Sequence, residues 1–299
     1  MVGTQTLPMR DGPIGATTFR EILVPNRKRN LGFFWACIRW LLKRRYEVAI
    51  RGADHRRLDH LSGPTLVLPN HPAYIDPAIV MSHLGSRQSL RPLVFAGTFR
   101  RWFLRPLMWV TRAVEVPDMQ RGRGESIRKT VRMMTQVIHG VQNGESYLIY
   151  PSGRLQRGTE EFVGGARIVS EVLRRCPDVN VVLVRTTGLW GSMFSCAGTG
   201  DLPNLGRAFL KSSWWLFAGG MFFVPKRQVS LHVEVLDRNQ LAALDRKTVN
   251  RFLEEWYNAE GQQLPVFVRY NKLIGPKRGK FAPTASRPAF ADSSLGNHP

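Results

Sequence analysis

Hydrophobic positions fall into two patterns along this chain. Short apolar runs typical of buried strands occupy residues 65–68, 92–96, 113–116, 147–150, 179–185 and 229–236. Between them, apolar residues recur at helical spacing over residues 99–110, 127–141, 160–174 and 246–257. The alternation predicts an α/β fold, with a mixed sheet flanked by helices. Such folds place their sites where strands end.

The helix predicted over residues 127–141 has an apolar side. Its members are Ile127, Val131, Met134, Ile138 and Val141, and Asn143 and Gly144 follow as the end of the helix. The helix is therefore predicted to be amphipathic.

An earlier helix is predicted over residues 31–42. Its apolar residues are Leu31, Phe34, Trp35, Ile38, Leu41 and Leu42, and its flanking cations are Arg27, Lys28, Arg29, Lys43, Arg44 and Arg45. This pattern predicts an N-terminal amphipathic helix at a membrane interface, with tryptophan at headgroup level and cations on acidic lipid. The alternative is a helix that packs on the protein's own core.

Composition limits the remaining possibilities. A formal charge of +21 favours an anionic partner, either acidic lipid or nucleic acid. Cys37, Cys176 and Cys196 have no metal-ligand spacing and suggest no disulfide framework, which indicates a reducing compartment. The first 25 residues lack a signal-peptide pattern. We expect an extension over residues 1–30, the membrane-associating helix and a linker over 31–60, one domain over 61–274 and a disordered tail over 275–299.

Candidate chemistry lies in the sequence NHPAYIDP, residues 70–77, directly after the first predicted strand. His71 has the residue type of a general base, and a carboxylate at Asp76 would hold its other ring nitrogen and stabilise the imidazolium. The alternative is purely structural. In that case Asp76 caps the helix that Pro77 begins, and His71 is a polar residue at a strand end.

Three segments occur in an order that resembles a known family. They are NHPAYID, then YPSGRLQRGTEEFVGGA at residues 150–166, then VNVVLVRTTGLWGS at residues 179–192. Together they resemble the first, third and fourth motifs of the glycerophospholipid acyltransferases of the PlsC type. The resemblance implies a glycerolipid acyltransferase-like fold and transfer of a fatty acyl group to a lipid hydroxyl, with His71 and Asp76 catalytic. It implies no metal and no organic cofactor.

The chain departs from that family's pattern where phosphate would be bound. Ser152 stands where the family usually has Glu, Arg154 and Leu155 stand where it has Thr and Arg, and the second motif's arginine is absent after residues 113–116. A guanidinium and backbone amides in a turn can replace these groups. The predicted substrate and phosphate site is Asn70, Ser152, Gly153, Arg154 and Arg157, with Arg121 and Arg123 as second choices. The alternative for the arginines is an ordinary solvated loop charge.

The resemblance also implies the partners. The donor would be acyl-CoA or an acyl-carrier protein, and the default acceptor 1-acylglycerol-3-phosphate, with a substituted lysophospholipid as the alternative. The protein would be peripheral or monotopic on the cytoplasmic face of an anionic membrane. Residues 214–224 are too few to span a bilayer, which needs about twenty, and are expected in the interface, in a wall of the acyl-chain cavity or in the core. A non-catalytic membrane or nucleic-acid binder is the other class. Nucleic acid is disfavoured because the cations are not grouped with stacking aromatics.

Overall fold

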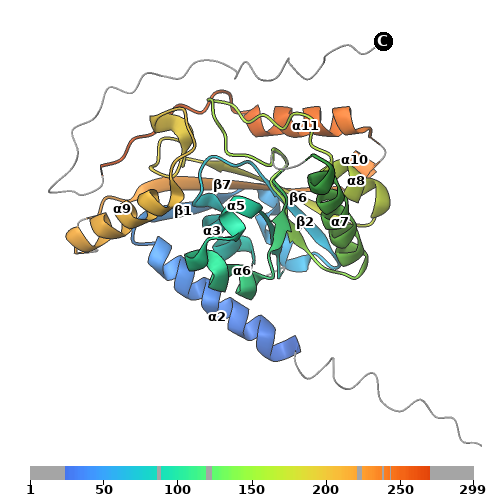
Figure 1. The fold of residues 1–299 in the computed structure, drawn as a ribbon, viewed down its shortest axis with the longest axis horizontal. Coiled ribbons are helices and arrows are strands. Elements are labelled where there is room, and N and C mark those ends of the chain that lie inside the picture. Colours follow the sequence, from blue (N-terminus) through green and yellow to red (C-terminus); the bar gives the residue numbers. More distant parts are fainter. Residues whose placement is uncertain are drawn as a thin grey trace, which may run out of the picture.

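The fold is built around one mixed β-sheet of seven strands with helices on both faces (Figure 1). The computed structural model describes residues 24–85, 89–118, 123–220, 224–237, 239–242 and 244–269. The expected α/β class is therefore confirmed. The tail predicted over residues 275–299 and most of the N-terminal extension lie outside the described residues.

The strand order across the sheet is β1-β7-β6-β2-β5-β3-β4. Strand β7 runs antiparallel to β6, whereas the other pairings are parallel. All six predicted strands are present. The strands are β1 (Tyr46–Arg51), β2 (Thr65–Pro69), β3 (Arg91–Phe95), β4 (Val114–Val116), β5 (Tyr147–Leu148), β6 (Asn180–Thr187) and β7 (Arg227–Leu236).

The edge strand β1 was not predicted, because its residues were assigned to a linker. Its sequence YEVAIR carries charges at two of six positions, and only Tyr46 is fully buried. It nevertheless pairs with β7 along its whole length. Strand pairing therefore brings residues 46–51 into the sheet of the domain.

Helical segments connect these strands. The helices are α2 (Val24–Leu42), α3 (Asp76–Val80), α5 (Ala96–Phe99), α6 (Arg105–Thr111), α7 (Arg123–Gln142), α8 (Ile168–Arg175), α9 (Leu205–Ala218), α10 (Asn239–Ala242) and α11 (Arg246–Asn258). The 3-10 and π segments are η1 (Ala53–His60), η2 (Met81–Gly85), η3 (Trp102–Leu104) and η4 (Cys196–Gly198).

Two predicted helices differ from the observed ones. The single helix expected over residues 99–110 is broken into α5, η3 and α6, because Arg101 adopts an extended conformation and Pro106 begins a new helix. The helix expected over residues 160–174 begins only at Ile168. Residues 161–164 instead form a loop whose backbone is hydrogen-bonded to side chains of α11.

The sheet separates two apolar cores, and strand β2 contributes to both. Leu66 and Leu68 point into the core covered by α7, α8 and α11, whereas Val67 points into the core covered by α2 and α3. Successive side chains of a strand face opposite sides, so a strand in the middle of a covered sheet is apolar throughout. Burial on both faces fixes the position of β2, whose end carries the NHPAYIDP segment.

The buried face of α7 agrees with the predicted one only in part, because Met134, Ile138 and Val141 pack on the core as expected but Ile127 and Val131 do not. Ile127 and Val131 are half exposed, at 50% and 57%, while Met133, Val137 and Val141 are buried. The buried row also contains Ser126 and Gly140, which do not count as apolar residues in a sequence pattern. Gly140 is required there, because a Cβ atom would lie 1.9 Å from the Tyr147 hydroxyl.

The predicted apolar face of α2 packs on the protein's own core, as the alternative interpretation of this helix stated. Trp35 is fully buried, and Leu31, Phe34, Ile38 and Leu42 pack against the same core. Leu41 of the predicted face is exposed instead, and Phe33 and Trp40 also face outward. Among the described residues, every helix is either too short or too polar to cross a membrane.

Residues 214–218 of the second apolar segment belong to α9, not to the core. Trp214 and Phe217 are largely exposed on this helix. Residues 221–223 lie outside the described part of the chain.

Candidate active site

The candidate site lies where β2 ends, and several backbone contacts shape the turn that follows. Asn70 is fully buried and holds Thr186 of the neighbouring strand β6 through both amide atoms, at 2.7 Å and 3.1 Å. The Tyr74 backbone N–H donates to the Phe194 carbonyl at 3.0 Å, and the Asp76 N–H donates to the Ala73 carbonyl at 3.1 Å. The turn is therefore closed by hydrogen bonds at both ends.

This turn brings the imidazole of His71 against the carboxyl group of Asp76. The Nδ1 atom of His71 lies 2.9 Å from the Asp76 Oδ2 atom. The imidazole side chain is 15% exposed, whereas the Asp76 side chain is fully buried. A buried carboxylate that accepts from Nδ1 leaves the Nε2 atom as the acceptor, which is the arrangement a general base requires.

Asp76 is held by more than the histidine. The Tyr150 hydroxyl donates to its Oδ1 atom at 2.7 Å, and the Ala73 N–H approaches its Oδ2 atom at 3.4 Å. The helix cap itself is Ile75, and no side chain caps α3. The interpretation of Asp76 as only a helix cap is therefore wrong, because its carboxylate is hydrogen-bonded to His71 and Tyr150 instead.

Tyr150 also contacts the imidazole directly. Its ring stacks on the His71 ring, with a centroid separation of 4.1 Å and an interplanar angle of 30°. Burial and the neighbouring Asp76 charge raise the pKa of Tyr150 well above its usual value, so the hydroxyl stays a neutral donor. Sequence reasoning used Tyr150 only as the aromatic residue that opens the third motif.

A second buried carboxyl group, that of Glu161, contacts the backbone of His71. Its side-chain Oε2 atom accepts the backbone N–H of His71 at 3.2 Å, and the residue is only 4% exposed. Burial raises the pKa of Glu161 to about 7, although the contacts with Ser152 and His71 act in the opposite direction. Sequence reasoning missed this residue, because in the sequence TEEF it looks like a surface acid.

Most of the predicted phosphate ligands have other contacts. Asn70 braces two strands, and the Gly153 N–H donates to the Tyr150 carbonyl at 3.0 Å in a turn where Gly153 has a φ of 62°. The Ser152 hydroxyl donates to the Arg154 carbonyl at 3.0 Å. The Arg154 guanidinium lies over the Phe162 ring, 5.2 Å from its centre.

Arg157 is exposed and directly follows Gln156, whose backbone N–H donates to the His71 carbonyl. Burial raises the pKa of Tyr74, and the charges of Arg101 and Arg157 act in the opposite direction. Arg101 was not predicted. Of the second choices, Arg123 is the first residue of α7 and Arg121 lies outside the described residues.

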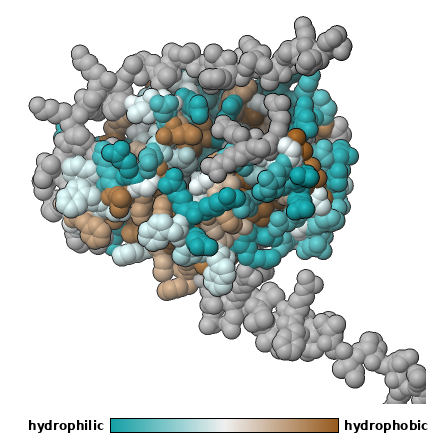
Figure 2. Space-filling view, viewed as in Figure 1, coloured by the Kyte–Doolittle hydropathy of each residue, from teal (hydrophilic) through white to brown (hydrophobic). Residues whose placement is uncertain are grey.

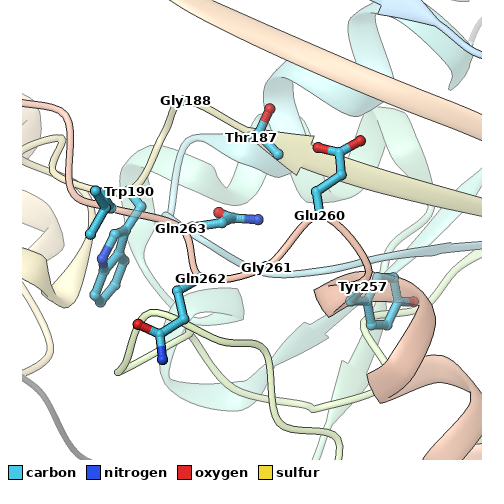
Figure 3. A pocket seen from close by; sticks show the side chains of 9 residues that line it. Thr187, Gly188, Trp190, Tyr257, Glu260, Gly261, Gln262 and Gln263 are labelled. Carbon is cyan, nitrogen blue, oxygen red and sulfur yellow. The ribbon is translucent and has the colours of Figure 1, made fainter.

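A cavity of about 220 Å³ lies near the carboxyl end of β6 (Figure 3). The side chains of Thr187, Glu260 and Gln263 surround its centre, and Trp190 and Tyr257 lie at opposite ends. None of its lining residues belongs to the His71 turn. It is also smaller than the roughly 300–1,000 Å³ usual for ligand pockets, so we assign it no substrate.

The α/β fold therefore carries a histidine and a buried carboxylate, paired on the turn that follows a central strand. The family model described as Acyltransferase matches residues 47–184, which include His71, Asp76, Tyr150 and Glu161. The match begins within β1, ahead of residue 61, where the sequence pattern placed the start of the domain. Residues 47–184 therefore form the acyltransferase domain that the motifs predicted, and the protein is an O-acyltransferase.

Among solved structures, the chain is similar to the 1-acyl-sn-glycerophosphate (LPA) acyltransferase PlsC from Thermotoga maritima. The sequences are 14% identical, and the alignment covers 81% of this chain and 86% of that one with a TM-score of 0.49. No curated protein matches the chain.

Proposed function

We propose that this enzyme transfers a fatty acyl group from acyl-CoA or an acyl-carrier protein to the free hydroxyl of 1-acylglycerol-3-phosphate. The observation that carries the proposal is the His71–Asp76 pair, with 2.9 Å between Nδ1 and Oδ2 and a partly exposed imidazole. The family match and the order of the three motifs support acyl transfer. The acceptor follows from the resemblance to the PlsC-type enzymes.

In the proposed reaction, the lipid hydroxyl oxygen attacks the thioester carbonyl while its proton passes to Nε2 of His71. Asp76 remains ionised, holds the Nδ1–H group and stabilises the imidazolium. As the tetrahedral intermediate breaks down, the carbon–sulfur bond breaks and the imidazolium returns its proton to the departing thiolate. An ester and a free thiol result, with no acyl-enzyme.

The surroundings of the pair favour this role. Tyr150 fixes both partners, because its hydroxyl bonds Asp76 and its ring stacks on His71. The Gln156 N–H also donates to the His71 carbonyl at 2.8 Å. An imidazole that is already oriented loses less entropy on reaching the reactive geometry.

For the phosphate of the acceptor, we propose Arg157 and Arg101 as the principal ligands. Arg157 follows Gln156, which is hydrogen-bonded to the His71 carbonyl, and Arg101 is an exposed cation whose charge, like that of Arg157, acts on Tyr74 of the same turn. Guanidinium groups suit phosphate because they offer paired donors. Arg154 remains a third candidate, since it is exposed beside the same motif. We infer a supporting structural role for Asn70 and Gly153, whose polar groups are already hydrogen-bonded.

We further propose that the enzyme associates with an anionic membrane surface without spanning it. Large aromatic side chains are exposed on three separate segments: Phe33 and Trp40 on α2, Trp102 and Trp109 around α6, and Phe209, Trp214 and Phe217 on α9. Figure 2 shows apolar side chains gathered on the lower left of one face, the side on which Figure 1 draws α9. Tryptophan beside cations suits the headgroup region of a bilayer, and Arg44 lies 4.7 Å over the Trp40 ring.

The decisive experiment is the variant His71→Ala, assayed as the purified full chain with radiolabelled acyl-CoA and a panel of lysolipids. General base catalysis is worth about two to four decades of rate, so we expect kcat to fall by about 10²- to 10⁴-fold with the fold retained. His139→Ala, an exposed histidine on α7, is the matched control and should keep full activity. Normal turnover by His71→Ala would refute the proposed mechanism, and a preferred acceptor other than 1-acylglycerol-3-phosphate would refute the proposed substrate.

A further inference from the structure

Glu161 is a buried carboxyl group that the proposed reaction does not use. It comes from the loop between the third motif and α8, yet its side chain reaches the backbone N–H of His71 at 3.2 Å. It also interacts with the Ser152 side chain. Removing a carboxyl group from water costs free energy, so the presence of a buried one beside the reactive histidine requires an explanation.

The loop that carries Glu161 holds both backbone polar groups of His71. Glu161 accepts the N–H group, and the Gln156 N–H donates to the carbonyl at 2.8 Å. The chain direction at His71 is therefore set by this loop as well as by the end of β2. Because the imidazole is attached at this point, a shift of the loop would move the reactive nitrogen.

The loop is itself fastened to α11. The Glu161 backbone exchanges two hydrogen bonds with the Asn258 side chain, both at 2.9 Å. Glu254 accepts from the N–H groups of Val163 and Gly164 at 2.8 Å and 2.9 Å. With its backbone fixed on one side by α11, Glu161 has a defined direction toward His71.

The position that Glu161 contacts is the one where this chain departs from its family. Ser152 occupies the place in the third motif where a glutamate is usual, and a serine side chain is two bonds too short to provide a carboxyl group there. The Ser152 hydroxyl has one proton, which it donates to the Arg154 carbonyl at 3.0 Å.

We infer that Glu161 is the positioning residue for His71, and that it replaces, from nine residues further along the chain, the carboxyl group missing at Ser152. The inference rests on the proposed function, because it assigns Glu161 to the orientation of the proposed base. Glu161 acts through the His71 backbone and does not touch the substrate. Its loss is expected to lower kcat while leaving substrate binding nearly unchanged.

The test is a carboxyl exchange between the two positions. We expect Glu161→Ala to lower kcat by about 10- to 100-fold with the KM for both substrates within about threefold, since misplacement of a reactive group by about 1 Å can cost 10² in rate. Adding Ser152→Glu to Glu161→Ala should restore at least a third of the lost kcat. Glu160→Gln, which changes the exposed neighbouring acid, is the matched control and should behave as wild type.

Should Glu161→Ala fail to fold, Glu161→Asp takes its place. It keeps the charge but withdraws the carboxyl group from the His71 N–H, and should lower kcat several-fold without changing KM. Wild-type kcat in the folded Glu161 variant overturns the positioning role, and a loss of kcat that Ser152→Glu does not repair overturns the exchange. Either result leaves the proposed function intact if His71→Ala is inactive, whereas full activity of His71→Ala removes the proposed base and this inference with it.

Discussion

The ionisation of Glu161 should make the stability of the fold depend on pH. Burial raises the pKa of this group from 4.5 to about 7. A carboxyl group with a raised pKa binds its proton more tightly in the folded state than in the unfolded state. The free energy of unfolding should therefore be highest below pH 4.5, should fall as pH rises toward 7, and should level off above that value. At about 1.4 kcal/mol for each pKa unit, the difference corresponds to about 3 kcal/mol.

The measurement is urea unfolding of wild type and Glu161→Gln at several pH values between 5 and 8. Glutamine keeps the size and the acceptor atom for the His71 N–H but cannot ionise. As the pH rises across this range, the free energy of unfolding of Glu161→Gln minus that of wild type should therefore increase by about 2–3 kcal/mol. Glu160→Gln, at an exposed position, should follow the wild-type curve. Parallel curves for wild type and Glu161→Gln would refute the assignment of a buried titrating carboxyl group.

Three further outcomes are expected. Tyr150→Phe removes the 2.7 Å hydrogen bond to Asp76 and should lower the free energy of unfolding by about 1–3 kcal/mol and kcat by about tenfold. The control Tyr257→Phe loses a 2.8 Å hydrogen bond to the Leu68 carbonyl and should lower stability without lowering kcat. Equal kcat in both variants would contradict the role of Tyr150. Arg157→Ala should raise the KM for 1-acylglycerol-3-phosphate about tenfold and leave the KM for a phosphate-free monoacylglycerol unchanged. Arg167→Ala is the control. Equal effects on the KM of both acceptors would exclude a phosphate contact. The double variant Trp214→Ser with Phe217→Ser should bind anionic vesicles at least tenfold more weakly in a sedimentation assay, because each aromatic side chain buried in the membrane contributes about 1.5–3 kcal/mol. The control double variant Gln136→Ser with His139→Ser should bind vesicles normally. Salt-sensitive DNA retention without vesicle binding would point to a nucleic-acid partner instead.

The central part of the fold follows from apolar runs, which is why β2 and β6 were predicted within two residues. A strand buried on both faces has few polar positions, so its pattern is unambiguous. Strand β1 was missed because an edge strand alternates with charged residues and resembles a linker. Part of the packed face of α7 was missed because Ser126 and Gly140 contribute to it through small size, which a hydrophobicity pattern does not detect.

The candidate site shows the same division between local and distant information. His71 and Asp76 are five residues apart on one turn, so sequence spacing was enough to pair them. Glu161 reaches the same histidine from 90 residues away, and its direction depends on a hydrogen bond from α11. Arg101 has an extended backbone where the predicted helix over residues 99–110 is broken, so helical spacing did not give its position. Contacts of this kind depend on tertiary packing, which one sequence does not display.

The attachment of the Glu161 loop to α11 has a consequence for protein engineering. The recognised family segment ends at residue 184, but Glu254 and Asn258 lie some 70 residues beyond it, and β7 separates β1 from β6. A truncated fragment that stops at residue 184 would leave two strands without their neighbour and the histidine's supporting loop without its anchor. The smallest active recombinant piece should therefore extend through α11, and circular permutants or fusions should be joined outside that span.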